Sequence, residues 1–300
     1  MFVIIGIIVV IAAILGGYLM EHGPVAVLMQ PAELIIIGGA ALGTVLIANP
    51  LHVLKPMFAG VLGAFKGSRF NKQLYLDMLK LLSDLYSRAR REGLVAMESD
   101  IEEPDKSAIF ANYPQFLKDH HVLYFICDTM RLAVTGGIDP FEIDTMMEAD
   151  IEVHHHDNSV PVDGLTTMAD SLPGLGIVAA VLGVVITMGA LGGPPEEIGH
   201  KVAAALVGTF LGILLCYGFV GPVAQNMSKV AAEEHSFYNV IRVSLITFIK
   251  GNPPIISVEM ARRSIPGHVR PTFLEMEAYC KGQPATASAG TESAVPVPES

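Results

Sequence analysis

Three consecutive histidines, His154, His155 and His156, are the side chains in this sequence that most readily suggest a chemical role. Imidazole groups bind transition metals and titrate near neutral pH. Adjacent residues on a helix point in different directions, however, so the three rings cannot enter one coordination sphere. The three cysteines of the chain form no CxxC pair, so no zinc site is indicated by them either. We expect no metal and no cofactor, and we interpret the histidines as a solvated or pH-sensitive segment.

Thr187 and Thr209 are the main polar side chains deep inside long apolar stretches. Each hydroxyl can bond back to a carbonyl of its own helix or face a polar lumen. The central parts of these stretches contain no Asp, Glu, Lys, Arg or His, although ionisable groups within a membrane are the usual mark of ion pathways. If this chain helps to move an ion, the titrating carboxylate must therefore come from another chain, and this chain supplies the walls.

Prolines and glycines also lie in these stretches. Pro173 and Pro222 each remove a backbone hydrogen bond and can bend a helix. Gly208 and Gly212 form a GxxxG pair, whose small residues let helices approach closely in lipid. Both features also have ordinary structural interpretations, as helix bends and as packing within the chain. No nucleophile elbow, Walker loop or dinucleotide fingerprint is present, so we expect that the protein is not an enzyme.

Four apolar stretches are long enough to carry these residues across a membrane. A helix needs about 20 mostly apolar residues to cross a hydrocarbon layer of roughly 30 Å. Charged residues make up only 16% of this chain, whereas soluble proteins contain about 25%. The first stretch has no Lys or Arg before it and no A-x-A site after it, so we interpret it as a retained span and not as a signal peptide. The stretches are residues 1–20, 34–54, 171–195 and 202–228.

The basic residues predict the orientation of these spans. Eleven of the nineteen Lys and Arg lie between His52 and Asp170, and seven lie from Lys229 onward. The remaining one is Lys201, in the short connection between the last two spans. Because cytoplasmic segments next to a membrane carry the excess of Lys and Arg, both termini and the long middle segment are predicted to be cytoplasmic.

The long middle segment and the region after the fourth span have a helical pattern. Between residues 70 and 91 apolar residues recur at helical spacing, and the stretch ends in basic residues before Gly93, as an amphipathic helix does. Further helices are predicted over 94–103, 114–134, 140–153 and 230–250. The fold class is therefore predicted to be all-α, a polytopic membrane protein with four transmembrane helices and a helical cytoplasmic domain.

This reading divides the chain into five segments. The C-terminal tail is rich in Ala, Ser, Thr, Pro and Glu and contains no large apolar anchor, so we expect it to be disordered. The segments are a transmembrane hairpin over 1–54, a cytoplasmic helical domain over 55–170, a second transmembrane hairpin over 171–228, a cytoplasmic C-terminal helical region over 229–281 and the tail over 282–300.

Long motifs in the last two spans resemble a known family. The segment 170–185, which begins Asp-Ser-Leu-Pro-Gly-Leu-Gly, and the segment 207–222, which begins Val-Gly-Thr-Phe-Leu-Gly, are similar to the third and fourth spans of MotA-type stator subunits of the bacterial flagellar motor. The resemblance covers nearly the whole chain except the tail. It continues through Asp-Ile-Glu-Glu-Pro at 100–104, Ile-Phe-Ala-Asn-Tyr-Pro at 109–114, Pro-Pro-Ile-Ile-Ser-Val-Glu at 253–259 and Arg-Pro-Thr-Phe at 270–273.

The resemblance implies a multi-pass subunit of the bacterial inner membrane that converts proton motive force into torque on the rotor. It implies a pentamer around two copies of a MotB-type partner, whose membrane helix carries the proton-binding aspartate and whose periplasmic domain binds peptidoglycan. It further implies that Arg90 and Glu98 contact a FliG-type switch-ring protein of the rotor. Pro173 and Pro222 match prolines that couple ion passage to motion, and Thr209 matches a threonine that faces the ion path.

One difference within the family bears on the transported ion. Sodium-type relatives carry a threonine where this chain has Ala180, so the resemblance favours H+. Three alternatives remain. An ExbB- or TolQ-type energiser of envelope processes has three spans and lacks the first hairpin. A substrate transporter would need a midplane binding site, often with internal repeats, and no convincing repeat is present. A purely structural scaffold would also lack intramembrane charge.

Overall fold

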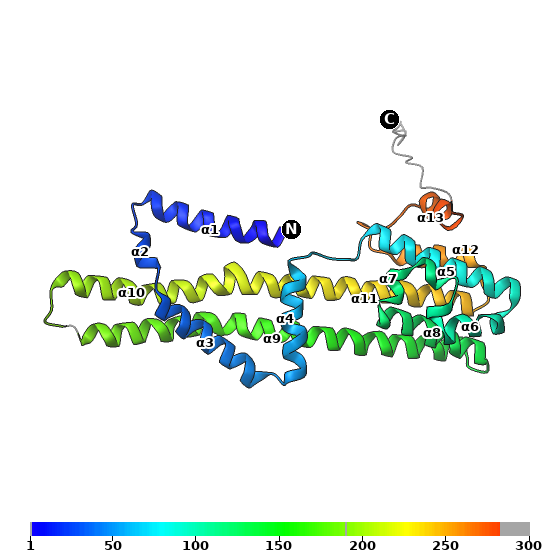
Figure 1. The fold of residues 1–300 in the computed structure, drawn as a ribbon, viewed down its shortest axis with the longest axis horizontal. Helices are drawn as coiled ribbons and strands as arrows, with labels where there is room; N and C mark the ends of the chain where they lie inside the picture. Colours follow the sequence, from blue (N-terminus) through cyan, green and yellow to red (C-terminus); the bar gives the residue numbers. More distant parts are fainter. Residues whose placement is uncertain (1, 190, 283–300) are drawn as a thin grey trace, which may run out of the picture. The chain divides into compact units, whose positions relative to one another are not determined.

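The structure is a computed structural model that describes residues 2–189 and 191–282. Every secondary-structure element in these residues is a helix, so the all-α prediction is confirmed for the described part of the chain (Figure 1). Apart from Gly282, the tail predicted to be disordered lies outside the described residues. The longer α-helices are α1 (Phe2–Met20), α3 (Pro31–Ala48), α4 (Leu51–Ala64), α5 (Lys72–Glu92), α8 (His120–Thr135), α9 (Pro140–Met188), α10 (Pro195–Leu214), α11 (Gly221–Ile249), α12 (Pro254–Ser264) and α13 (Phe273–Cys280).

Short helices connect several of these elements. The α-helices among them are α2 (Val25–Leu28), α6 (Glu98–Glu102) and α7 (Pro114–Leu117). A π-helix over Leu215–Val220 lies between α10 and α11. The 3₁₀ helices are Leu94–Met97, Pro104–Lys106 and Phe110–Asn112.

The chain forms two compact units. Unit 1 contains the chain up to Arg69 together with Glu152–Glu234. Unit 2 contains Phe70–Ile151 and the described residues from His235 onward. The chain therefore passes between the units three times, once in the linker before α5, once within α9 and once within α11.

Four segments of the structure are long and apolar enough to cross a membrane. They are Phe2–Met20, Val25–Ala48, Pro140–Met188 and Pro195–Ile249. The second differs from the predicted stretch 34–54, because α3 ends at Ala48 before Pro50 and α4 is a separate helix. The uncharged run begins only after Glu33, whereas the apolar segment of the structure begins earlier, at Val25.

The core of unit 1 is built from apolar side chains of α3, α4, α9 and α11. Two clusters make up this core, and the extended apolar faces of α3 and α9 contribute to both. Leu54 and Met57 of α4 are buried against Val223 and Met227 of α11. The second cluster consists of Ile37, Ala41, Ala169, Leu172, Ala179 and Cys216.

The core of unit 2 is centred on α5, and its predicted amphipathic pattern is confirmed. The side chain of Asn71 accepts a hydrogen bond from the N–H of Leu74 at 3.0 Å and so caps the helix. The helix ends at Gly93, whose φ of 90° suits a residue without a Cβ. Tyr86 is fully buried and stacks on Phe248 with ring centroids 4.1 Å apart, one of several aromatic contacts in this unit.

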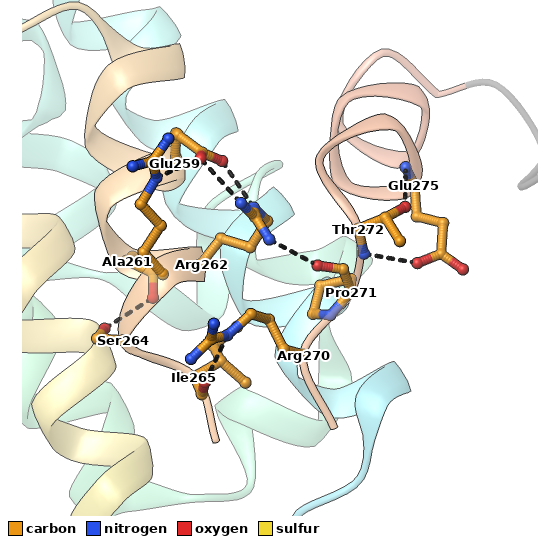
Figure 2. A network of polar contacts seen from close by, with 10 residues as sticks. Glu259, Ala261, Arg262, Ser264, Ile265, Arg270, Pro271, Thr272 and Glu275 are labelled. Atoms are coloured by element: carbon orange, nitrogen blue, oxygen red, sulfur yellow. Dashed lines mark hydrogen bonds and ion pairs between the residues drawn. The ribbon is translucent and has the colours of Figure 1, made fainter. Parts of the chain in front are cut away.

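The two motifs near the C-terminal end of the described chain form one polar network (Figure 2). Arg262 donates to Glu259 at 2.7 and 2.9 Å and to the carbonyl of Pro271 at 3.0 Å. These bonds from Arg262, together with Arg263, lower the pKa of Glu259 to about 2 despite its partial burial. Thr272 and Glu275 then form a capping box at the start of α13. The two motifs therefore have a structural role, holding α12 and α13 together.

Candidate functional site

Helices α9 and α10 approach each other so closely that backbone contacts backbone. A Cβ added at Gly212 would lie 2.6 Å from the carbonyl oxygen of Leu172 and 2.8 Å from the Cα of Gly176. A Cβ added at Gly183 would lie 2.7 Å from the Cβ of Ala205. Real Cβ atoms essentially never make such contacts, so glycine is required here. Gly212 of the GxxxG pair thus packs within the chain, as in the structural interpretation of that motif.

Ala180, one of the two residues predicted to line the ion path, lies at this helix contact, and Thr209, the other, is the residue after Gly208 on α10. Gly208, which precedes Thr209, faces the backbone of α9, and a Cβ there would lie 3.1 Å from the nitrogen of Ala180. Thr187 donates to the carbonyl of Gly183 at 2.8 Å, so its hydroxyl is bonded to its own helix. Within the described residues the Thr209 hydroxyl makes no hydrogen bond to its own helix. Of the two threonines, Thr209 is therefore the one whose hydroxyl can bind another partner.

Glu33 is a carboxylate that the sequence interpretation missed. It lies in the first turn of α3 and is only 7% exposed. Its Oε2 atom has no hydrogen-bond partner among the described residues and would lie 2.7 Å from a Cβ at Gly208. This carboxylate therefore faces the same part of α10 as Thr209. In the sequence, Glu33 lies just before the uncharged run 34–54 that predicts the second span.

Pro222 lies just after the π-helix Leu215–Val220, separated from it by Gly221. Proline has no N–H to donate to the carbonyl of the preceding turn, and wider i→i+5 turns often occur where the helix ladder is interrupted at functional sites. A Cβ at Gly221 would lie 2.8 Å from the carbonyl oxygen of Cys216, five residues earlier. Pro173 lies inside α9, next to Leu172, whose carbonyl meets Gly212. Pro222 therefore lies next to an irregular helix segment, and Pro173 lies next to the close contact between α9 and α10.

A cavity of about 330 Å³ opens beside Pro222. Asp170 and Thr166 of α9 and Gln225 of α11 contribute polar groups to its lining. The tyrosine ring of Tyr217, in the π-helix, lines it as well. A partly polar recess thus lies between α9 and the start of α11, where polar side chains can hold water.

Arg90 and Glu98, the residues predicted to contact the rotor, lie on either side of Gly93 and both are exposed. Neither forms an ion pair within the described part of the chain. Arg88, to which the sequence analysis assigned no role, instead donates to the buried Asp100 at 2.6 Å. Asp100 also accepts a hydrogen bond from Ser107 at 2.6 Å. Arg88 and Asp100 thus hold the turn in place and leave Arg90 and Glu98 free for contacts outside the chain.

Arg90 borders a cavity of about 280 Å³ in unit 2. The lining is mostly apolar, with Leu94, Leu132 and Phe248 among its side chains. Gly136 and Gly251 line it too, and both have positive φ values that end α8 and α11. An exposed cation next to an apolar recess is an arrangement found at protein–protein interfaces, where arginine is enriched.

Comparison with protein families gives two matches along the chain. Residues 4–93 match the family model "Motility protein A N-terminal". Residues 118–238 match the MotA/TolQ/ExbB proton channel family. The two matches include the helices of both predicted hairpins and the turn at Gly93.

Individual relatives cover almost the full chain. The chain is 40% identical to motility protein A of Salmonella typhimurium over 281 residues, which is 94% of this chain and 95% of the relative. It has the same identity and coverage with motility protein A of Escherichia coli, and it is 36% identical to the chemotaxis protein LafT of Vibrio parahaemolyticus over 93% of this chain and 98% of that relative.

Two solved structures have a similar fold. The C. jejuni MotAB structure superimposes with a TM-score of 0.72 at 20% sequence identity, covering 88% of this chain and 95% of that chain. The flagellar MotAB stator complex of Bacillus subtilis gives a TM-score of 0.71 at 24% identity, covering 88% and 96%. At these identities the likeness concerns the fold alone.

Proposed function

The chain belongs to the motility protein A family within the MotA/TolQ/ExbB proton channel proteins, and from that membership we propose how it acts as a stator subunit of the flagellar motor. The observation that carries this function is the 40% identity to motility protein A over 94% of the chain. The alternative, an ExbB- or TolQ-type energiser, is disfavoured because the match to the motility protein A N-terminal region covers residues 4–93, which contain the first hairpin.

The channel needs a second type of subunit. The apolar parts of α9 and α10, residues 171–188 and 202–214, contain no ionisable side chain, and the solved structures of the same fold are MotAB complexes. We infer that a MotB-type partner supplies the proton-binding aspartate and that several copies of this chain, five by the family resemblance, surround it. The many exposed large apolar side chains of α1, α9 and α10 are compatible with lipid and with such subunit contacts. Both termini are cytoplasmic in this proposal, in a bacterial inner membrane.

The proton is the transported ion in this proposal. Sodium is a hard cation that requires several oxygen ligands at once, whereas a proton moves along a chain of single hydrogen bonds. Ala180 has no oxygen to offer in its side chain, and Thr209 contributes one hydroxyl that is not bonded to its own helix. One protein hydroxyl is too few ligands for a dehydrated sodium ion.

Motility supported by this chain is therefore expected to be independent of sodium. Cells that carry the chain and its partner as their only stator should swim at a speed that follows the proton motive force and does not change when external sodium is replaced by potassium at constant osmolarity. A protonophore should stop them. The measurement is swimming speed against external sodium, and a steep sodium dependence would show that the proton assignment is wrong.

The cytoplasmic turn at Gly93 is proposed as the contact with a FliG-type rotor protein. Arg90 and Glu98 are exposed and unpaired within the described chain, and Arg90 borders the apolar recess, whereas the neighbouring Arg88 pairs with the buried Asp100. Exposed charges of this kind contribute mainly to the rate and register of docking between two surfaces. Reversal of one sign introduces repulsion and should be more harmful than removal of the charge.

Arg90→Glu is expected to reduce torque strongly without lowering the amount of stator in the membrane, because no internal contact is lost. Arg91→Glu is the matched control, since Arg91 is the adjacent exposed cation and is not predicted to contact the rotor. The measurement is torque in a bead assay, together with membrane abundance. A charge reversal on the rotor protein should restore part of the torque, and rescue only by Glu98→Lys in this chain would contradict the rotor contact.

A further inference from the structure

Helix α4 turns away from the second span instead of continuing it. Asn49 and Pro50 have extended backbone conformations, with φ and ψ of -127° and 137° at Asn49 and -70° and 159° at Pro50, so the chain leaves its helical path there. In Figure 1, α4 runs across α9 and α11 and not alongside them. Because α9 and the start of α11 belong to the third and fourth spans, a helix that runs across them lies along the membrane plane.

The buried side of α4 packs at one end of these spans. It shares an apolar cluster with α9 and α11, formed by Leu54, Met57, Ala64, Val162, Leu165, Val223, Ala224 and Met227. The α9 residues of this cluster come shortly before the uncharged stretch 171–195, and the α11 residues lie in the last turns of the stretch 202–228. In the proposed topology α4 therefore lies at the cytoplasmic boundary of the membrane.

The other side of α4 combines large apolar side chains with lysines. Leu51, Phe58 and Leu62 are 79%, 48% and 68% exposed. Lys55 is exposed and lies one helical turn from Leu51 and from Phe58, and Lys66, also exposed, comes one turn after Leu62. We call these five residues the α4 outer face. An apolar stripe with lysines beside it is typical of a helix that lies in a membrane interface, where the ammonium groups reach the headgroups.

The charge of the α4 outer face is positive and is not neutralised by its own segment. Residues 34–76 contain no Asp or Glu. Neither Lys55 nor Lys66 forms an ion pair with any residue that the structure describes, whereas Arg69, further along the linker, pairs with Glu234 at 3.0 Å. A lysine close to an anionic membrane surface strengthens binding by about fivefold. The two lysines thus complement negatively charged headgroups.

The apolar part of the α4 outer face continues the exposed surface of the second span. Leu46 and Ile47, in the last turn of α3, are 63% and 89% exposed and come just before the turn at Asn49. Leu51 begins α4 directly after that turn. A surface of α3 that faces lipid is therefore followed without interruption by the outer face, which favours lipid over a protein partner as its occupant.

We propose that the α4 outer face binds anionic phospholipids of the cytoplasmic leaflet. Leu51, Phe58 and Leu62 enter the upper part of the acyl chains, and Lys55 and Lys66 contact the headgroup phosphates. This inference rests on the topology given with the proposed function, in which both termini are cytoplasmic. The contact holds α4, and with it the start of α11, at the membrane surface.

The test uses tryptophan as a contact probe, because the sequence contains no tryptophan. Phe58→Trp places one indole on the α4 outer face, where the native ring is exposed. The complex of this variant with its partner is reconstituted in vesicles of equal parts phosphatidylcholine and phosphatidylglycerol, with quenching bromine atoms on the acyl chains of one lipid or the other. Fluorescence of the partner is subtracted with the complex of the unaltered chain. Brominated phosphatidylglycerol should quench the indole about two- to fivefold more than brominated phosphatidylcholine.

Lys55→Gln combined with Lys66→Gln, in the Phe58→Trp chain, should remove this preference. The two lipids should then quench equally, because the apolar side chains still enter the acyl region. The matched control is Lys118→Gln combined with Lys250→Gln, which removes two exposed lysines from unit 2 and should keep the preference.

Equal quenching by the two lipids in Phe58→Trp itself would overturn the proposed preference, and a preference that survives the loss of both lysines would overturn their role. Quenching by neither lipid, in Phe58→Trp and in Leu62→Trp, would mean that a protein surface covers α4, either of a second copy of this chain or of another protein. None of these measurements requires rotation. A chain that binds anionic lipid but does not support swimming would therefore count against the stator function and not against this inference.

Discussion

Replacement of Gly212 by alanine should abolish motility, because the added methyl group has no space between α9 and α10. Its Cβ would lie 2.6 Å from the Leu172 carbonyl oxygen and 2.8 Å from the Cα of Gly176, and both of these atoms belong to the backbone. No side chain can rotate away to relieve the contact, so the helices must separate. Overpacking of this kind costs about 1–3 kcal/mol. The separation also shifts Gly208, on the preceding turn of α10, away from the backbone of Ala180.

Gly174→Ala is the matched control for this prediction. Gly174 lies in the same part of α9, and a Cβ added there meets no atom within 4 Å. Swimming and membrane abundance should both be close to wild type in the control, whereas Gly212→Ala should lose swimming and part of its abundance. Wild-type swimming of Gly212→Ala would mean that the close contact of the two helices is not needed for function.

Pro222→Ala should also stop the motor, but by a different route. Alanine restores the backbone N–H that proline lacks, so the π-helix Leu215–Val220 can return to regular α-helical hydrogen bonding. We expect insertion and assembly to be largely intact, because helix propensity improves and no buried side chain of comparable size is lost. Torque should nevertheless fall by about tenfold or more, which corresponds to ~1.4 kcal/mol in the coupling step.

Torque and membrane abundance, measured in parallel, separate coupling from folding. Pro173→Ala is expected to behave like Pro222→Ala, and Pro161→Ala is the control, since Pro161 also lies inside α9 and has no proposed role in coupling. If either coupling variant disappears from the membrane in proportion to its loss of torque, a mechanical role for that proline is not supported. Gly212→Ala should lose membrane abundance, whereas the proline variants should keep it, so the two predictions can be tested independently.

Features that depend on neighbouring residues in the sequence were predictable. The uncharged runs identified the long apolar helices, and the spacing of apolar residues from 70 to 91 gave α5 with its end at Gly93. The predicted helix over 94–103 consists of a 3₁₀ helix followed by α6, because Gly93 at positive φ redirects the chain and a short tight turn follows. These outcomes follow from local hydrophobic patterning and from turn chemistry.

Features that depend on contacts between distant residues were not predictable. Arg88 and Arg90 look alike in the sequence, yet only Arg88 meets the buried Asp100, because the turn at Gly93 brings Asp100 back over α5. Arg69, His154 and Asn158 likewise meet around Glu234 although they are far apart along the chain and share no pattern. No residue pattern in the sequence predicts the π-helix before Pro222 either. In each case the role of a side chain or backbone group depends on a partner that is distant in the sequence and comes close only in the folded chain.

The buried carboxylate of Glu33 has a consequence for the order in which the protein is made. A charged side chain in the middle of a membrane costs about 2.5–3.5 kcal/mol during insertion, and less near the ends of a span. In the finished protein Glu33 faces Gly208, but Gly208 belongs to the last span to leave the ribosome. The nascent α3 therefore enters the bilayer without its final neighbour, and the apolar run from Leu34 to Ala48 must hold it there. The first hairpin completes its packing only after synthesis of the second.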